Sequence, residues 1–223
     1  MKLIQEKIIE ADGMLSVLIR NRNEQDYIGF AIQSVIDHLT DYEIIVVDNE
    51  STDDSLDIVR SFNFEPIKIE SINNYTPGRS INRGIQSASG DYVLILSAHS
   101  QIVQFYQNEL LKSLDDYVCV FGNQTPILRG KKITKRYVWS NFGDEDVVNM
   151  WSDAENRQFL HNAFALYSRD FLLKNPFDET LAGKEDRYWA NDVVSAGHKY
   201  LYHSEMKCNH YWTPGGATWK GIG

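Results

Sequence analysis

The sequence is poor in cysteine and proline and contains no long apolar run. Its 223 residues include only two cysteines, Cys119 and Cys208. Their spacing fits neither a paired metal site nor a disulfide framework, so we expect two buried free thiols in a reducing compartment. Five prolines and an ordinary charge content argue against disorder. The lack of a signal peptide or a membrane-length apolar segment predicts a soluble, cytoplasmic protein.

Basic residues are also scarce. The chain has 22 Lys and Arg against 31 Asp and Glu, which gives a net charge of −9 at pH 7. A nucleic-acid-binding protein needs a broadly basic face, so we expect no nucleic-acid partner. An anionic ligand would have to bind at a site where a few Lys or Arg side chains lie close together. No G-x-G-x-x-G segment follows a strand pattern, which disfavours a dinucleotide-dependent dehydrogenase.

The most informative stretch that is present is GDYVLILSAHS, residues 90–100. An unbroken apolar run over residues 92–96 ends abruptly at Ser97, His99 and Ser100. A run of this kind, bounded by glycine and polar residues, predicts a strand that is buried on both faces. Ligands of open α/β sheets bind beyond the carboxyl ends of such strands. We therefore expect the functional site at residues 97–100.

Short apolar strands alternate with amphipathic helices over the first 121 residues. Strands are predicted at residues 15–19, 43–47, 67–69, 92–96 and 117–121, with helices between most of them. This alternation predicts an α/β fold with a parallel sheet covered on both faces. Beyond residue 122 the alternation fades. A strand at residues 160–167 and a helix at residues 183–196, ended by Gly197, are predicted there.

Four segments of the sequence resemble family 2 glycosyltransferases of the GT-A fold. They are SVLIRNRNE (residues 16–24), EIIVVDNESTDDS (43–55), PGRSINRGI with SGDYVLIL (77–85 and 89–96), and GKED (183–186). The resemblance is close over residues 15–100 and looser over residues 162–212. It implies a single GT-A (Rossmann-like) α/β domain over residues 1–223, with a mostly parallel sheet flanked by helices. Residues 1–121 would bind a nucleotide sugar, and residues 122–223 would form the acceptor-binding and catalytic portion.

The resemblance also implies a reaction. The chain is expected to be an inverting glycosyltransferase that moves a hexosyl or deoxyhexosyl group from a nucleotide-diphosphate sugar to a hydroxyl of a growing bacterial surface glycan. That acceptor would be a capsule, lipopolysaccharide O-antigen or similar glycan, free or lipid-linked. Inversion needs a carboxylate that takes the acceptor proton. Asp186 is expected to be this base, with Glu185 beside it, although acids at a helix start are also common for dipole reasons.

The donor-binding residues that the resemblance implies are spread over three strand ends and one helix. Asp48 is expected at the nucleobase, with capping of the next helix as its structural alternative. Gly78 would let the backbone approach the ligand, and Asn82 and Arg83 would face the pocket, although Arg83 is as readily a surface residue. The full set is Arg20, Asn23, Glu24, Asp48, Gly78, Arg79, Asn82, Arg83, Ser97 and His99.

The family places a metal-binding D-x-D motif just past the strand at residues 92–96. This sequence has Ser97, Ala98 and His99 there, and hard cations prefer carboxylate oxygens. Two alternatives follow. In the first, His99 and His210 would hold Mn or Mg. In the second, no metal is bound, and His99 and arginines such as Arg20 would stabilise the diphosphate. We favour the metal-independent alternative by a small margin.

The basic stretch at residues 129–136 stands out in an acidic chain. One interpretation is a hairpin exposed to solvent. The other is a contact with an anionic membrane surface or a lipid diphosphate, and this contact would place the protein at the inner face of the membrane. Trp189 and Trp212 are candidates for stacking on an acceptor sugar, although large aromatic residues are usually in the core. A rival function is a non-catalytic nucleotide-sugar or glycan-binding subunit. A sugar nucleotidyltransferase is disfavoured because its glycine-rich first loop is absent.

Overall fold

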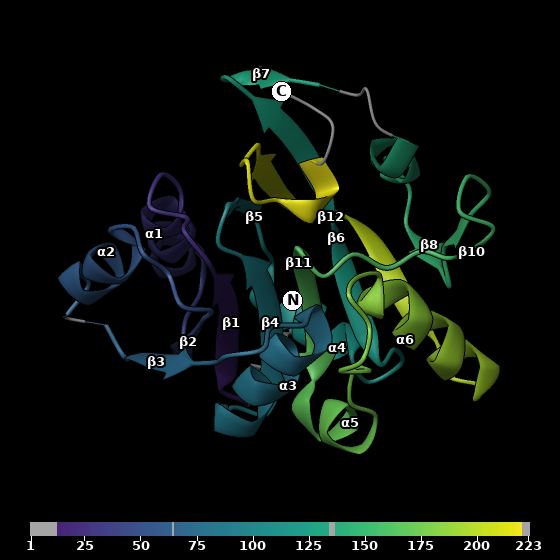
Figure 1. Cartoon of the computed structure of the whole chain (residues 1–223). Helices are drawn as coiled ribbons and strands as arrows, with labels where there is room; N and C mark the ends of the chain where they lie inside the picture. Colours follow the sequence, from purple (N-terminus) through teal and green to yellow (C-terminus); the bar gives the residue numbers. More distant parts are fainter. Residues whose placement is uncertain (1–12, 64, 134–136, 220–223) are drawn as a thin grey trace, which may run out of the picture.

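The computed structural model describes residues 13–63, 65–133 and 137–219. Within these ranges, a ten-stranded mixed sheet crosses the centre of the molecule and helices cover both of its faces (Figure 1). The main strands lie in the order β3-β2-β1-β4-β11-β6-β12-β5. The short strands β7 and β8 pair with β6 and β12, and β9 and β10 form a separate hairpin.

The strands are β1 (Leu15–Asn21), β2 (Tyr42–Asp48), β3 (Ile67–Ser71), β4 (Tyr92–Ser97), β5 (Ser100–Gln104), β6 (Cys119–Leu128), β7 (Lys131–Lys132), β8 (Val147–Val148), β9 (Trp151–Ser152), β10 (Arg157–Gln158), β11 (Phe164–Ser168) and β12 (Tyr200–Tyr211). The helices are α1 (Ile28–His38), α2 (Ser55–Ser61), α3 (Pro77–Ser87), α4 (Gln107–Ser113), α5 (Arg169–Lys174) and α6 (Glu185–Ser195), with 3-10 turns η1 (Tyr137–Asn141) and η2 (Ala217–Trp219).

The first four strands are parallel, as the alternation in the sequence predicts. β1 pairs with β2 on one side and with β4 on the other, so that Arg20 lies beside both Val47 and Ser97. β2 pairs in parallel with β3. These four strands end at the same edge of the sheet, where the loops that follow them gather. The predicted α/β class, with a mostly parallel central sheet flanked by helices, is confirmed.

The second half of the sheet differs from the prediction. β5 begins three residues after β4 ends, whereas the sequence pattern predicts no strand between residue 97 and a helix at about residues 106–114. The long strand β12 covers residues for which no strand was predicted, and it lies parallel to β6 and antiparallel to β5. β11 runs antiparallel between β4 and β6, and it begins at Phe164 rather than at residue 160. The acceptor-side residues therefore extend the same sheet.

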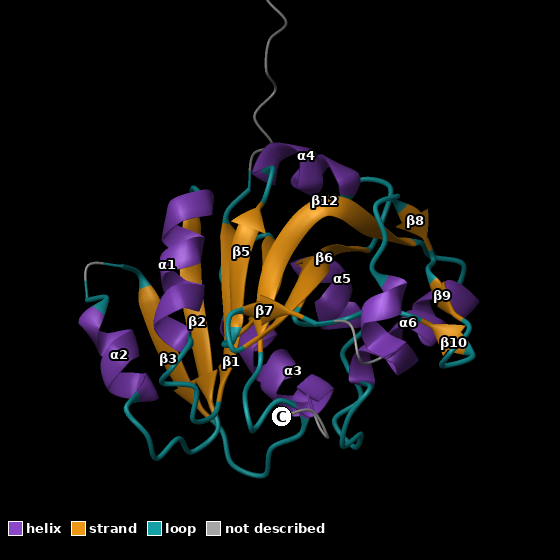
Figure 2. Ribbon diagram, turned by 90° about the horizontal axis from the view of Figure 1, so that it is seen from above, coloured by secondary structure: helices purple, strands orange, loops and turns teal. Residues whose placement is uncertain are grey.

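Alternate side chains along each strand pack against opposite helix layers. Val17 and Ile19 share a core cluster with residues of α1, α2 and α4, whereas Leu18 packs with residues of α3, α5 and α6. Figure 2 shows where these helices lie around the sheet. The fit is tight at Gly84 of α3, where an added Cβ would lie 1.5 Å from Leu18 Cδ1. Helix α3 can lie this close to the sheet because residue 84 has no side chain.

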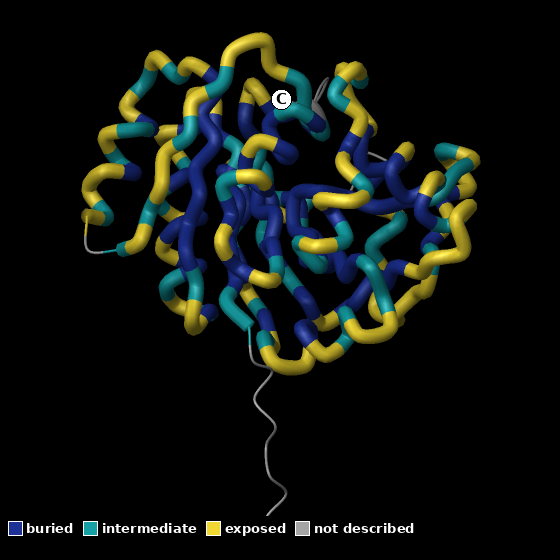
Figure 3. The backbone as a smooth tube through the Cα atoms, turned by 90° about the horizontal axis from the view of Figure 1, so that it is seen from below, coloured by how far each residue is buried: buried dark blue, intermediate teal, exposed yellow. Residues whose placement is uncertain are grey.

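Buried residues concentrate in the central strands, and exposed residues lie on the outer loops and helix surfaces (Figure 3). Cys119 and Cys208 are free and buried, as predicted. Trp189 is 4% exposed and packs among the rings of Tyr167 and Phe177, so it belongs to the core and not to an acceptor surface. In the described part of the chain, every helix is too short or too polar to cross a bilayer.

Candidate active site

A cavity of about 440 Å³ lies where the carboxyl ends of β1 and β4 meet the start of α6. β1 and the loop after it contribute Arg20, Arg22 and Glu24 to its wall, and β4 with its following turn contributes Ser97 and His99. Its opposite wall comes from the second half of the chain, namely Glu155, residues 161–163, residues 182–187, His210, Gly215, Gly216 and Thr218. The predicted location of the site, beyond the strand at residues 92–96, is therefore where the structure has its cavity.

Several buried polar atoms in the cavity wall have no hydrogen-bond partner in the described structure. They include Arg20 Nε, Asn21 Oδ1, Glu24 Oε2, Asn49 Nδ2, Asn162 Nδ2 and His210 Nε2. Most buried polar groups in proteins are paired, because an unpaired one costs about 1–3 kcal/mol. Donors and acceptors left free around one cavity are typical of a site that binds a polar ligand.

Asp48 and Asn23 lie outside the cavity and organise the loops that border it. Asp48 accepts hydrogen bonds from Asn21 Nδ2 at 2.8 Å and from Ser51 Oγ at 2.6 Å. Asn23 has a left-handed φ of 54°, and its Oδ1 accepts a hydrogen bond from the Thr52 N–H at 2.7 Å. The β1 and β2 loops are thus tied together, and the neighbouring Asn21 and Asn49 line the cavity instead.

Gly78 and Asn82 of α3 also face away from the cavity. An added Cβ at Gly78 would lie 2.4 Å from the carbonyl oxygen of Asp178, so the close approach there is to protein backbone. Asn82 donates to the Phe177 carbonyl at 2.8 Å and accepts from the Phe177 N–H at 3.0 Å. The expectation that Asn82 faces the pocket is not met, because its amide is used in fastening the loop before α6.

Arg79 and Arg83 lie on the outer side of α3, each beside a carboxylate. Arg79 Nε is 3.4 Å from Glu179 Oε2, and Arg83 Nη2 is 2.6 Å from Glu70 Oε2. Both arginine side chains are more than 40% exposed. They line a separate shallow hollow, so the structure brings neither of them to the cavity that holds Arg20, Ser97 and His99.

Asp186 is fixed at the start of α6 by three hydrogen bonds. Its Oδ2 accepts from the Asn162 N–H at 3.1 Å and from Arg187 Nη1 at 2.8 Å, and its Oδ1 accepts from the Arg187 N–H at 2.9 Å. Lys184, the residue before the helix, has a left-handed φ of 61° and turns the chain sharply into α6. Asp186 is buried at the cavity wall, where the protein shields it from bulk water.

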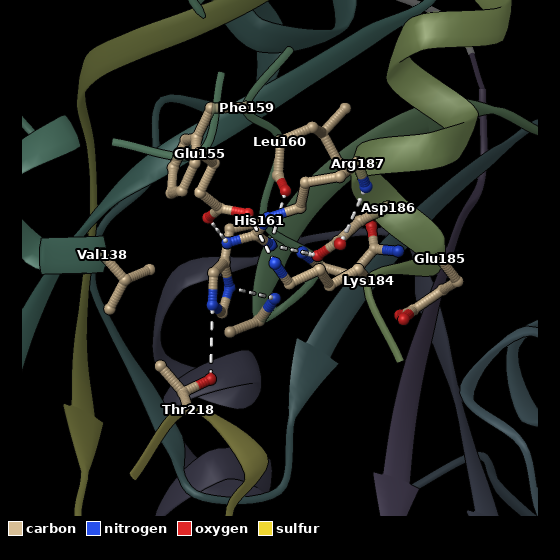
Figure 4. A network of polar contacts seen from close by, with 12 residues as sticks. Val138, Glu155, Phe159, Leu160, His161, Lys184, Glu185, Asp186, Arg187 and Thr218 are labelled. Carbon is tan, nitrogen blue, oxygen red and sulfur yellow. Dashed lines mark hydrogen bonds and ion pairs between the residues drawn. The ribbon is translucent and has the colours of Figure 1, made fainter. Parts of the chain in front are cut away.

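Glu185 points away from the Arg187 cluster (Figure 4). Its Oε1 lies 3.4 Å from Arg20 Nη1, which joins the two walls of the cavity. Burial raises the pKa of Glu185, the negative charge of Asp186 raises it further, and Arg20 partly offsets both effects. The structure thus brings Arg20 together with Glu185 and Asp186, although Arg20 and Glu185 are 165 residues apart in the sequence.

Three histidines form the floor of the cavity. His99 Nδ1 is 3.0 Å from Glu24 Oε1, and the His99 and His210 rings have centroids 4.9 Å apart. His161 Nε2 lies 3.3 Å from Thr218 Oγ1 (Figure 4). Burial lowers the pKa of His161 and of His210 well below the usual range, so both rings are neutral at pH 7.

These residues define how a divalent metal would be held. His210 Nδ1 pairs with Gln124 Oε1 at 2.9 Å, which leaves Nε2 unpaired at the cavity. Yet no group of three or more His, Cys, Asp or Glu side chains in the described residues is arranged as a metal site. A metal is therefore compatible with the cavity only if a bound ligand or water completes its coordination, because Mn and Mg prefer oxygen ligands to imidazole nitrogens.

The contributions of Asn49, Glu155, His161, Asn162 and Arg187 were not predicted from the sequence. The segment at residues 160–163 was included in a strand, although its polar pair His161 and Asn162 is the kind of signal that marks a strand end at a site. Arg187 directly follows the acidic pair, and an arginine beside a predicted base is a recognisable partner. Asn49 lies just past the predicted strand at residues 43–47 and carried the same strand-end signal, whereas Glu155 carried none.

Comparison with known proteins decides the family. The model of the family described as glycosyl transferase family 2 matches residues 16–174, which is most of the chain. The chain belongs to this family. This assignment confirms the resemblance to the family: three of the four sequence segments lie in the matched region, and GKED at residues 183–186 lies outside it.

Two curated relatives are glycosyltransferases of bacterial glycans. GalNAc(5)-diNAcBac-PP-undecaprenol beta-1,3-glucosyltransferase of Campylobacter jejuni is 26% identical over 183 residues, which are 79% of this chain and 59% of that protein. O-antigen chain rhamnosyltransferase WbaN of Salmonella anatum is 27% identical over 187 residues, which are 77% of this chain and 58% of that protein. The chain thus spans less than two thirds of the length of either relative, and together they support a role in glycosyl transfer.

The fold is also that of solved GT-A glycosyltransferases. The crystal structure of GalNAc-T7 with UDP, GalNAc and Mn²⁺ superposes with a TM-score of 0.72 at 17% identity, covering 91% of this family 2 chain and 44% of that one. At this identity the likeness shows the shared fold. The GT-A architecture predicted from the sequence is confirmed.

Proposed function

We propose that this family 2 protein is an inverting glycosyltransferase that uses a nucleotide-diphosphate sugar and glycosylates a hydroxyl of a bacterial surface glycan. The observation that carries the proposal is the cavity itself. A buried acidic pair, Glu185 and Asp186, stands on one wall, and unpaired polar atoms of the β1 and β2 loops stand on the other. Residues 1–121 would hold the donor and residues 122–223 the acceptor, in one domain.

The reaction follows from this arrangement. Asp186 takes the proton of the acceptor hydroxyl while that oxygen forms a bond to the anomeric carbon. The bond between the anomeric carbon and the diphosphate oxygen breaks on the opposite face, and the electron pair leaves with the diphosphate. The configuration at the anomeric carbon inverts. Transfer of a hexosyl or deoxyhexosyl group fits a cavity of about 440 Å³ that opens to solvent.

The diphosphate would lie among Arg20, Arg22, Ser97 and His99, which line the end of the cavity nearest β1 and β4. We propose that these side chains, rather than a divalent metal, offset most of its charge, because the guanidinium fork matches phosphate oxygens. Where Mn is bound, His99 and His210 would contribute nitrogen ligands, and the ion would supply further positive charge at the leaving group.

A thermal-shift titration with UDP, dTDP, GDP and CMP, each with Mn or with EDTA, tests the donor site. One nucleotide at a hundredfold excess over its Kd should stabilise the protein by about 2.7 kcal/mol, or roughly 5–10 °C. The shift should persist in EDTA and should be lost in R20A. A shift that requires Mn would overturn metal independence. No shift with any nucleotide would overturn the proposed donor site, and binding without turnover would favour a non-catalytic subunit.

We further propose that the β6–β7 hairpin touches an anionic membrane surface that carries a lipid-linked acceptor. Lys131 and Lys132 are exposed at its tip, where Arg129 and Gly130 form a left-handed turn. Lys135 and Arg136, also predicted to belong to this basic stretch, lie outside the described residues. Its positive charge contrasts with the net charge of −9 for the whole chain.

Charge reversal tests this contact. Each lysine near an anionic surface contributes about 1 kcal/mol, so K131E/K132E should weaken binding to vesicles that contain phosphatidylglycerol by at least about tenfold. The exposed residues Lys112 and Lys199, changed together to Glu, provide a control of equal charge. Equal loss of vesicle binding in both double variants would mean that only net charge matters, and the hairpin would not be the contact.

A further inference from the structure

The acidic pair does not stand alone at the start of α6, because Arg187 is held rigidly behind it. The Arg187 residue is 7% exposed. Its Nη1 donates to the Leu160 carbonyl at 2.8 Å as well as to Asp186 Oδ2 at 2.8 Å. Its guanidinium carbon lies 4.4 Å from the centre of the Phe159 ring, within range of a cation–π contact.

Glu155 completes the support from the β9–β10 hairpin. Its carboxylate is almost fully buried, with Oε1 at 3.4 Å from Arg187 Nη2 and Oε2 at 3.3 Å from Lys184 Nζ (Figure 4). Lys184 and Arg187 flank the acidic pair in the sequence, so Glu155 ties both sides of the pair to the same hairpin. Buried charges in proteins are kept only when they are paired, and here Glu155 lies within ion-pair distance of both Lys184 and Arg187.

The hydrogen bonds on Asp186 leave room for a substrate. A carboxylate offers about four lone-pair positions, and the Asn162 N–H, the Arg187 N–H and Arg187 Nη1 occupy three of them. One position stays open on a carboxylate that cannot rotate without breaking these bonds. An acceptor hydroxyl that reaches this position would meet the base in one orientation.

We propose that Arg187, anchored by Glu155 and Phe159, is the positioning residue of the base Asp186. This inference rests on the proposed function, because it concerns how the base is aimed and not whether one is needed. Arg187 acts through Asp186, to which it donates two hydrogen bonds. Its role is to hold the carboxylate within hydrogen-bond reach of the acceptor, where a displacement of about 1 Å costs roughly a hundredfold in rate.

The test compares R187K, R187Q and E155Q with the wild type. Release of UDP, dTDP or GDP from the corresponding nucleotide sugars, with water as acceptor, measures turnover without a known glycan. We expect R187Q to lower kcat by about a hundredfold and E155Q by about tenfold, while KM for the nucleotide sugar stays within about threefold. R187K keeps the charge but not the planar fork, so it should recover only part of the lost kcat.

R157Q is the matched control. Arg157 lies on the same hairpin, with its guanidinium 5.2 Å from the Tyr188 ring, and it does not contact Asp186 in the described structure. It should keep the kcat of the wild type. Should R187Q fail to fold, R187K and E155Q decide the question, because each leaves the buried charge at Asp186 paired.

The outcomes separate the two proposals. A wild type that binds no nucleotide in calorimetry and releases none from any nucleotide sugar overturns the proposed function. An active wild type whose kcat is retained in both R187K and E155Q overturns the role of Arg187 alone. A parallel rise of KM and fall of kcat in E155Q and R157Q would show general loosening of the hairpin, which also overturns it.

Discussion

Replacement of Asp186 by Asn should lower kcat for glycosyl transfer by about 10²–10⁴-fold, because the acceptor hydroxyl would lose its proton acceptor. The amide keeps the shape of the side chain and one oxygen that accepts from Arg187, so nucleotide binding should stay unchanged. Initial rates of nucleotide release, measured beside nucleotide affinity by calorimetry, check both parts of this prediction.

Two further variants sharpen the result. D170N removes an exposed acid in the first turn of α5, away from the cavity, and should behave as the wild type. E185Q removes the carboxylate nearest Arg20 and should weaken catalysis less than D186N. If E185Q were the more damaging change and D186N kept most of the rate, Glu185 would be the base, which its raised pKa would suit.

Replacement of Glu43 by Gln should destabilise the fold by about 2–3 kcal/mol at pH 7. Glu43 lies at the start of β2, and its carboxylate accepts hydrogen bonds from Ser16 and Ser89 and pairs with Lys68 Nζ at 2.7 Å. Burial alone would raise the pKa of Glu43, but the bonds from Lys68, Ser89 and Ser16 outweigh it and lower the pKa to about 2. Urea unfolding at pH 7 measures the difference.

The pH dependence of this effect has a defined sign. The folded-state pKa of about 2 lies below the ordinary value of 4.5, so the carboxylate contributes its full stability above about pH 5. That contribution declines as the pH falls from about 4.5 towards 2, where both states become protonated. The difference in unfolding free energy between wild type and E43Q should therefore shrink across this interval.

An exposed ion pair serves as the control for Glu43. Asp57 pairs with Arg60 one helical turn away, and its side chain is 78% exposed. D57N should change the free energy of unfolding by less than about 0.5 kcal/mol at any pH. A loss in D57N as large as that in E43Q, or a loss in E43Q that persists unchanged at pH 2, would contradict the assignment to the buried network.

The parallel half of the fold was predictable because β1, β2 and β4 contain continuous apolar runs between clear polar boundaries. β12 was not predicted because polar and charged residues, Glu205 and Lys207 among them, interrupt any apolar pattern along it. It is a strand because it pairs with β6 on one side and with β5 on the other. These partner strands are distant in the sequence, so the local pattern of apolar residues gives no information about the pairing. β5 escaped because it is short and follows β4 almost directly.

The candidate site was predictable where it follows a strand or opens a helix. Arg20, Glu24, Ser97, His99, Glu185, Asp186 and His210 all line the cavity. Asn82 and Arg83 were expected there as residues of a helix start, but these neighbouring side chains on α3 fasten to Phe177 and Glu70 instead. The packing of a helix decides which of its faces lines a cavity. The resemblance to a family does not reveal that packing.

The position of β11 in the sheet affects how the chain folds during its synthesis on the ribosome. β4, at the centre of the sheet, pairs with β1 on one side and with Phe164–Ser168 on the other. During synthesis, the edge of β4 therefore stays open until about residue 168 has left the ribosome. An open apolar edge is a template for pairing between chains, so nascent or truncated chains that stop at residue 121 should aggregate and need a chaperone.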